Sequence, residues 1–243
     1  MFLLKATREQ LAHLLPAGGT GLEIGVADGY YADILLSAAQ PARLHLIDPW
    51  MHQDDPDYVD DEMNVPGDEA GRRYEKVRQR FAGDIASGRV VIHRGFSQDF
   101  AASFPDGYFD WIYIDGAHHF EACARDLRLY TPKVKDDGLI LGHDYAASPY
   151  ARQKNFGVVE AVNGFIASGE VDMMLLTYEQ FPTYVLCKRP LRPLPHVFMG
   201  QALARFDVAA EIRRPETKRF EQYIATIGDG RNTLAERLVL AFD

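Results

Sequence analysis

Residues 109–145 read FDWIYIDGAHHFEACARDLRLYTPKVKDDGLILGHDY, and the fold prediction starts from this segment. Two short apolar runs, Trp111–Ile114 and Leu139–Leu141, each end at acidic residues and histidines. The segment Glu121–Val134 between them has a helical pattern. Strands that alternate with helices predict βαβ units and a parallel sheet. In such an open sheet, ligands bind at the carboxyl ends of the strands.

Four side chains suited to chemistry follow these two runs. Asp115 and His118 come after the first run, and His143 and Asp144 come after the second. If the two strands are neighbours, the four side chains share one crevice at the sheet edge. Carboxylates suit a hard divalent cation, and imidazole titrates near neutral pH. The pattern favours a metal and a base here, while Asp126 on the intervening helix is expected to be solvated or salt-bridged.

The same alternation continues through the chain. Further strands are expected at residues 21–26, 43–47, 89–93, 172–176 and 183–187. The last two strands lie too close together for a crossover helix and should pair antiparallel. We therefore predict an α/β fold with a doubly wound, mostly parallel seven-strand sheet, Rossmann-like, over residues 1–190.

The chain after Lys188 begins with a Pro-rich break and continues with helical patterns. Residues 191–243 are therefore predicted to form a helical C-terminal extension that is not a separate domain. It would serve as a cap, a dimer element or a substrate wall, and a homo-oligomer is left open.

Composition narrows the class of protein. The net charge of −9 disfavours nucleic acid and anionic membrane as partners. The sequence contains no run of 18 apolar residues, so no transmembrane span is predicted. Residues 5–15 resemble an amphipathic helix more than a signal peptide. Cys123 and Cys187 lack metal-site spacing and are expected to be buried free thiols. A cytoplasmic protein is predicted.

A glycine-rich turn follows the first of these strands. It has the form E-x-G-x-x-x-G with Glu23, Gly25 and Gly29, whereas the dinucleotide fingerprint requires G-x-G-x-x-G. Glycine lets the backbone approach a ligand closely. The acid would repel a pyrophosphate but attract a cationic amino group. A nicotinamide cofactor is therefore disfavoured, and a zwitterionic cofactor without phosphate is favoured.

Three more positions extend this cofactor hypothesis. Asp48 ends the second strand, where an acid accepts hydrogen bonds from ribose hydroxyls; the alternative is an Asp-Pro turn. Ser97 and Gln98 would bind an adenine edge, or cap the next helix. The acidic segment His52–Glu69 is either a lid at the ligand edge or a solvated loop.

Together these residues resemble those of class I S-adenosylmethionine-dependent methyltransferases. The closest resemblance is to metal-dependent O-methyltransferases, of the catechol and caffeoyl-CoA type and of the macrocin and mycinamicin sugar type. The motif IDGAHHFEACARDL followed by GLILGHDY is similar to a bacterial branch near the sugar type, and the resemblance covers roughly residues 20–147. It implies S-adenosyl-L-methionine as cofactor, with Mg²⁺ or another divalent cation.

The resemblance also implies roles for individual residues. Glu23, with the backbone around Gly25 and Gly29, would hold the methionine part of the cofactor. Asp48 would bind the ribose, and Ser97 and Gln98 the adenine.

The second half of the motif would supply the metal and the base. Asp115, which also borders the cofactor, would bind the metal with Asp144. His143 stands where sugar-type relatives carry a further acidic ligand. His118 stands where catechol-type relatives carry a lysine base, and the acid of the sugar type is replaced here by Ala117.

The expected activity is methyl transfer to a hydroxyl group of a small-molecule acceptor. A sugar or glycoside is favoured, and a catechol-like phenol is next. The alternative is an S-adenosylmethionine-binding protein of a cephalosporin-hydroxylase-like branch that transfers no methyl group. A nicotinamide oxidoreductase is disfavoured by Glu23 and by the glycine spacing.

Overall fold

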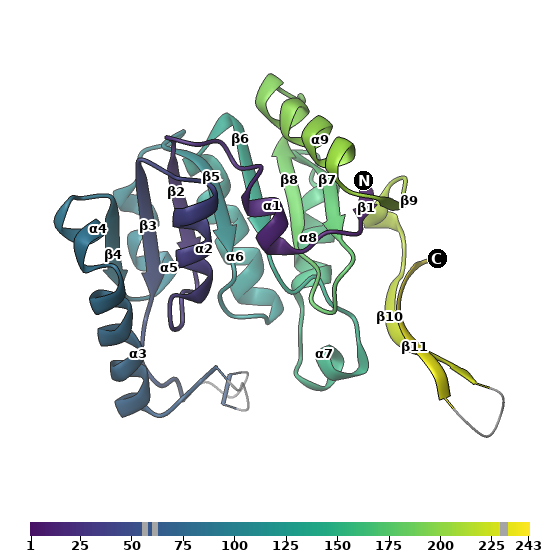
Figure 1. The fold of residues 1–243 in the computed structure, drawn as a ribbon, viewed down its shortest axis with the longest axis horizontal. Coiled ribbons are helices and arrows are strands. Elements are labelled where there is room, and N and C mark those ends of the chain that lie inside the picture. The colour runs from purple at the N-terminus through teal and green to yellow at the C-terminus, as the bar shows by residue number, and fades with distance from the viewer. Residues whose placement is uncertain (55–57, 60–62, 229–232) are drawn as a thin grey trace.

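The computed structural model describes residues 1–54, 58–59, 63–228 and 233–243. Most of it is one sheet with helices on both faces (Figure 1). The strands of this sheet are β1 (Phe2–Leu4), β2 (Thr20–Ile24), β3 (Arg43–Asp48), β4 (Val90–Arg94), β5 (Phe109–Ile114), β6 (Val134–Gly142), β7 (Val171–Thr177), β8 (Tyr184–Lys188) and β9 (Val208–Glu211). Their order across the sheet is β4-β3-β2-β5-β6-β8-β7-β1-β9.

The helices alternate with the strands as the sequence predicts. They are α1 (Arg8–Ala12), α2 (Tyr30–Ala38), α3 (Gly67–Arg80), α4 (Ala82–Ala86), α5 (Ser97–Phe100), α6 (Phe120–Tyr130), α7 (Pro149–Gln153), α8 (Val158–Ala167) and α9 (Pro193–Arg205). Strands β2 to β6 run parallel, and β8 lies antiparallel between β6 and β7. The doubly wound, mostly parallel Rossmann-like sheet and its late antiparallel pair are thus confirmed.

The sheet has nine strands in the described residues instead of the predicted seven. The two additional strands, β1 and β9, extend the edge beyond β7; β1 runs parallel to β7 and β9 antiparallel to β1. The N-terminal helix is correspondingly shorter than the expected residues 5–15. Strands of three or four residues are too short to show a periodic pattern, which explains the error.

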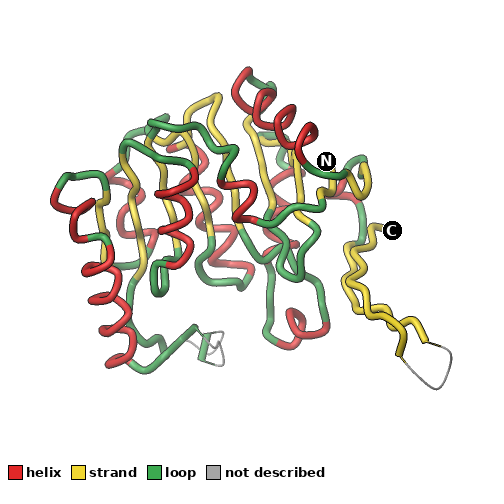
Figure 2. The backbone as a smooth tube through the Cα atoms, viewed as in Figure 1, coloured by secondary structure: helices red, strands yellow, loops and turns green. Residues whose placement is uncertain are grey.

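The C-terminal extension is not helical throughout, so that prediction is wrong. After α9 the chain forms β9 and then a two-stranded hairpin of β10 (Phe220–Gly228) and β11 (Thr233–Phe242). The hairpin projects away from the main sheet (Figure 2). The sequence TLAERLVLAF of β11 is rich in Leu, Ala, Glu and Arg, which favour helices in isolation. Strand pairing with β10 over most of its length overrides that preference.

Both faces of the sheet are buried, which explains the continuous apolar runs. Along β5, Ile112 and Ile114 enter one core cluster, and Trp111 and Tyr113 enter the other. This alternation follows from the two-residue period of a strand. Each large apolar side chain that is fully buried contributes roughly 1.5–3 kcal/mol, so β5 anchors both layers and fixes the position of Asp115 at its tip.

The two cysteines are free and buried, as predicted. Burial raises the pKa of the Cys123 thiol to about 12, which keeps it protonated and unreactive. Among the described residues, no helix has the length and apolarity required to cross a membrane.

A histidine pair joins β3 to β4, with His45 buried and His93 half-buried. His45 Nδ1 lies 2.9 Å from His93 Nε2, and His45 Nε2 lies 3.2 Å from the Tyr108 hydroxyl. The rings of Phe104 and Phe109 stand edge-on to His45. Burial, together with the charges of His93 and Arg43, lowers the pKa of His45 to about 4. The pair is therefore neutral at physiological pH.

This pair should make the fold sensitive to mild acid. Because the folded-state pKa of His45 lies near 4 and its ordinary value is 6.5, its contribution to stability is complete above pH 6.5 and is lost as the pH falls toward 4. We expect His45→Phe to unfold with a weaker dependence on pH between 7 and 5 than the wild type, measured by urea denaturation. Equal pH dependence in the two proteins would contradict this assignment.

Candidate active site

A cavity of about 880 Å³ opens at the carboxyl ends of β2, β3 and β5. The predicted site residues that line it are Glu23, Gly25, Asp48, Ser97, Gln98, Asp115, His118, His143 and Asp144. Gly29 is not among the lining residues. It precedes α2 with φ of 80°, and a side chain there would meet Val77 and Phe81 at 3.2 and 3.1 Å. Its described contacts are thus with the packing of α3, behind the cavity.

Gly25 permits the closest backbone approach in the site. Its φ is +85°, and a Cβ at this position would lie 1.9 Å from the carbonyl oxygen of Asp115. The amide of Asp115 also donates to the carbonyl of Ile24 at 2.8 Å. The turn after β2 and the tip of β5 are therefore held in direct contact, and only glycine fits between them.

Asp48 holds the glycine turn from the other side. Its Oδ2 accepts hydrogen bonds from the amides of Val26 and Ala27, both at 2.9 Å, and its Oδ1 accepts from the amide of Trp50 at 2.7 Å. The Trp50 indole in turn donates to the Ala27 carbonyl at 2.7 Å. Burial raises the pKa of Asp48, and the three amide bonds oppose that rise. Asp48 thus forms the turn and the cavity wall together, and its contact with a ribose stays a prediction.

At the predicted adenine end, Ser97 is bonded to Asp126, a residue whose surroundings differ from the expected ones. Ser97 donates from its hydroxyl to Asp126 Oδ1 at 2.5 Å, and Tyr130 donates to the Ser97 carbonyl at 2.6 Å. Asp126 is buried and lines the cavity, so the expectation that it is solvated or salt-bridged is wrong. Burial raises its pKa to about 6. Asp126 lies four residues from both Ala122 and Tyr130, which are buried on α6. This helical spacing indicates that Asp126 shares their buried face.

The acidic segment 52–69 borders the cavity in part. His52, Asp54 and Tyr58 belong to the cavity wall, whereas residues 55–57 and 60–62 lie outside the described residues. The position at the ligand edge agrees with the expected one, and closure as a lid stays a prediction.

Glu23 is a buried carboxylate at the end of β2. Only 1% of its surface is exposed, and within the described residues its Oε2 has no hydrogen-bond partner. Burial and the negative charge of Asp115 raise the pKa of Glu23 well above its ordinary value, and the positive charge of Arg8 opposes the rise. A buried polar atom without a partner is costly, so this oxygen is suited to a donor from a ligand.

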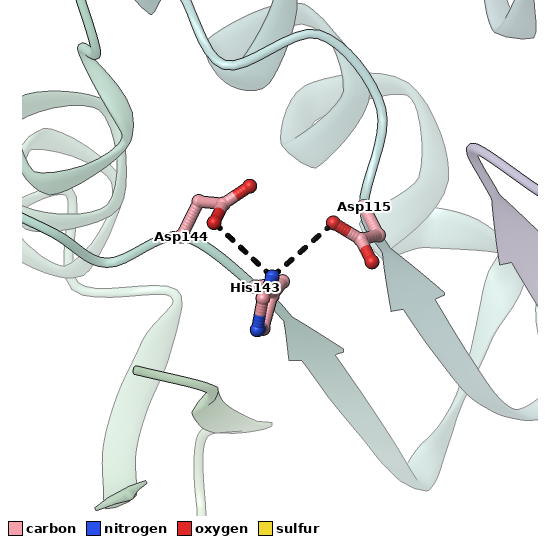
Figure 3. Close-up of side chains that lie close together, drawn as sticks. All are labelled: Asp115, His143 and Asp144. Carbon is pink, nitrogen blue, oxygen red and sulfur yellow. Dashed lines mark ion pairs between the residues drawn. The ribbon is translucent and has the colours of Figure 1, made fainter. Parts of the chain in front are cut away.

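Asp115, His143 and Asp144 meet at the tips of β5 and β6 (Figure 3). One possible ligand atom from each lies within 4.8 Å of the others. His143 Nδ1 lies 3.4 Å from Asp115 Oδ1 and 3.1 Å from Asp144 Oδ1. Burial lowers the pKa of His143, but the two carboxylates outweigh burial and raise it to about 10. Two carboxylates and one imidazole form a donor set that fits a divalent cation.

His118 belongs to the same network. Its Nδ1 lies 2.8 Å from Asp144 Oδ2, and its ring stacks on Phe156 with centroids 4.4 Å apart. Burial raises the pKa of Asp144, but the bonds from His118 and His143 outweigh burial and lower it. Because Asp144 accepts a hydrogen bond from Nδ1–H, the neutral His118 ring carries its proton on Nδ1. Its Nε2 then has the lone pair and can accept a proton. His119 precedes α6 as its N-cap residue and makes no side-chain capping bond.

Arg8, which no sequence motif predicts, enters the site from α1. Its Nη1 donates to Asp115 Oδ2 at 2.8 Å, and its guanidinium lies 4.6 Å from the centre of the Tyr31 ring. Arg8 also lines the cavity. It is separated from Asp115 by 107 residues, and no motif links the two positions.

The contact between the glycine turn and β5 can be tested by adding one methyl group. We expect Gly25→Ala to displace the tip of β5, to lower the melting temperature and to abolish binding of S-adenosylhomocysteine. Gly18→Ala is the matched control, because Gly18 also has a positive φ of +75° but open space around its Cβ. Backbone strain alone costs about 1–2 kcal/mol. Equal melting temperatures for the two variants would refute the steric argument.

Solved structures of similar fold come from several kinds of protein. A proposed rRNA methylase from Clostridium thermocellum has 12% identity and a TM-score of 0.51, covering 75% of this chain and 93% of that one. Spermidine synthase from Thermotoga maritima has 15% identity and a TM-score of 0.50, covering 83% and 63%. A methyltransferase from Podospora anserina, bound to S-adenosylhomocysteine, has 16% identity and a TM-score of 0.49, covering 70% and 71%. At these identities the first two likenesses show the fold alone.

No curated protein matches the sequence. A family model described as a methyltransferase domain matches residues 22–145, which extend from the start of the glycine turn to the residue after Asp144. The matched range contains the glycine turn, Asp48, the adenine-end residues and the whole acid–histidine cluster. The chain therefore belongs to this methyltransferase family, within the class I S-adenosylmethionine-dependent methyltransferases.

Proposed function

We propose that this protein is an O-methyltransferase that uses a divalent cation and transfers the methyl group of S-adenosylmethionine to a hydroxyl of a small molecule. The observation that carries the proposal is the Asp115–His143–Asp144 cluster beside the cofactor cavity, with His118 bound to Asp144. It supplies possible ligands for a cation and a possible base in one place.

The cation would be held by Asp115 and Asp144, with His143 as the third ligand. Magnesium prefers oxygen ligands and usually retains several waters. Carboxylates also suit manganese, and imidazole suits iron, nickel, copper and zinc. A bound cation lowers the pKa of a coordinated hydroxyl and fixes its orientation. This would make the acceptor oxygen a nucleophile toward the methyl carbon of the sulfonium.

His118 is the proposed base. Its bond to Asp144 orients the ring and favours the tautomer with the acceptor nitrogen at Nε2. The stacking contact with Phe156 restrains the ring plane. A base positioned in this way typically contributes about 10²–10⁴-fold to the rate.

The proposed acceptor is a polyhydroxylated molecule, with a sugar or glycoside ahead of a catechol-like phenol. Two vicinal oxygens would replace two waters on the cation. The net charge of −9 supports a small acceptor rather than nucleic acid or a membrane surface. A screen of sugars, glycosides and phenols with added Mg²⁺ or Mn²⁺ tests the proposal. Cofactor binding without turnover on any acceptor would favour the alternative of a binding protein that transfers no methyl group.

Metal dependence is the first discriminating test. We expect EDTA to abolish turnover and added Mg²⁺ or Mn²⁺ to restore it, because the acceptor oxygen loses its activating charge. Asp115→Asn and Asp144→Asn should each weaken cation binding measured by calorimetry. Asp137→Asn is the control, since Asp137 is an exposed acid on β6. Full activity in EDTA would refute the role of a metal and leave the acids as cofactor or substrate contacts.

The base is tested separately from cofactor binding. His118→Ala should lower kcat about 10²–10⁴-fold with little effect on the affinity for S-adenosylhomocysteine, because a base acts in the transition state. His119→Ala, at the adjacent position, is the control and should retain most activity. Near-normal kcat in His118→Ala combined with a loss in His119→Ala or His143→Ala would show that another group accepts the proton.

A further inference from the structure

The cavity that receives the cofactor has an acidic wall with few cations. Three arginines line it within the part of the chain that the structure describes: Arg8, Arg73 and Arg125. Arg73 lies on α3 and pairs with Glu69 at 3.4 Å. Arg125 lies on α6, where its charge acts on Asp126 at the end of the cavity that holds Ser97. Neither is placed at the tips of β2 and β5.

Arg8 stands at the tip of β5, where it contacts Asp115. Its Nη1 lies 2.8 Å from Asp115 Oδ2, and its charge also acts on Glu23. A fifth of its side-chain surface remains accessible. The Tyr31 ring lies under the guanidinium, 4.6 Å from its centre, and limits where the group can move. The guanidinium also pairs through Nε with Glu9 at 3.5 Å. The position of Arg8 is therefore set by two salt bridges and an aromatic face, with access to the cavity.

Glu23 is an acid whose carboxyl group lies near the positive charge of Arg8. Its carboxylate is 1% exposed, lines the cavity, and has an oxygen with no hydrogen-bond partner in the described structure. An acid that can accept hydrogen bonds and a guanidinium that can donate them thus lie together at one end of the cavity. This pair is complementary to an α-amino acid, which carries an ammonium and a carboxylate on the same carbon.

We propose that Arg8 binds the carboxylate of the methionine part of S-adenosylmethionine, next to Glu23, which accepts from its ammonium group. A guanidinium carries five N–H donors in a planar fork, so it can bind Asp115 and a second carboxylate from different edges. The cofactor would then be selected by its α-carboxylate as well as by its nucleoside. The inference rests on cofactor use, which family membership shows, and does not depend on the metal or the acceptor.

A pair of ligands that differ only in the carboxylate tests this assignment. S-adenosylhomocysteine and its decarboxylated analogue share the nucleoside, the thioether and the amino group. We expect the wild type to bind the first roughly 10- to 100-fold more tightly, as for loss of a hydrogen bond between charged groups. Arg8→Gln should lose that preference and Arg8→Lys should keep part of it. The control Arg72→Gln should keep all of it, because Arg72 is exposed on α3, pairs with Asp68 and does not line the cavity. Calorimetry measures the four proteins with both ligands.

The ratio of the two affinities separates recognition from a structural role. Arg8→Gln leaves Asp115 without its guanidinium partner, and a structural disturbance would weaken both ligands equally. An equal loss for both ligands, or a wild-type preference that survives in Arg8→Gln, would overturn the inference. A wild type that binds neither ligand would overturn it together with the cofactor assignment, whereas failure of the acceptor screen would leave it intact.

Discussion

The three hydrogen bonds that Asp48 accepts from the backbone hold the site together. An ionised carboxylate that binds amides forms stronger bonds than a neutral acceptor does, and here the amides belong to the glycine turn and to the chain just after β3. The turn is therefore fixed in a conformation with Gly25 at a φ of +85°. This brings the turn against the tip of β5. The relative placement of Glu23 and Asp115 depends on that contact.

The acid–histidine cluster poses a separate electrostatic problem. Two carboxylates that lie close together repel each other unless a cation lies between them, and His143 fills that position at the tip of β6. An imidazole that binds a metal must be neutral. If the proposed cation binds here, its entry and the release of a proton from His143 are therefore linked. Arg8 balances the outer oxygen of Asp115 in either case.

The sequence predicted those parts of the site that follow from general rules of parallel sheets. Asp115, His143 and Asp144 follow apolar runs, and neighbouring parallel strands bring such residues to one edge. Gly25 was predictable because a tight strand-to-helix turn needs glycine. Arg8 was not, because its approach depends on how α1 docks after the sheet has formed. Asp126 was predicted to be solvated or salt-bridged because an acid on a helix is usually exposed. Only the buried residues at helical spacing around it on α6 indicated otherwise.

The pairing of β1 has a consequence for the order in which the molecule is assembled during synthesis. Residues 2–4 leave the ribosome early, but their sheet partners, β7 and β9, lie at residues 171–177 and 208–211. Contacts between segments so far apart in sequence form late. Helix α1 follows β1 and carries Arg8, so the strand that precedes this helix finds its place in the sheet only when β7 is available. A nascent chain released before β7 would contain every residue of the methyltransferase motif and still lack the strand pairing of β1, the segment that leads into α1 and Arg8.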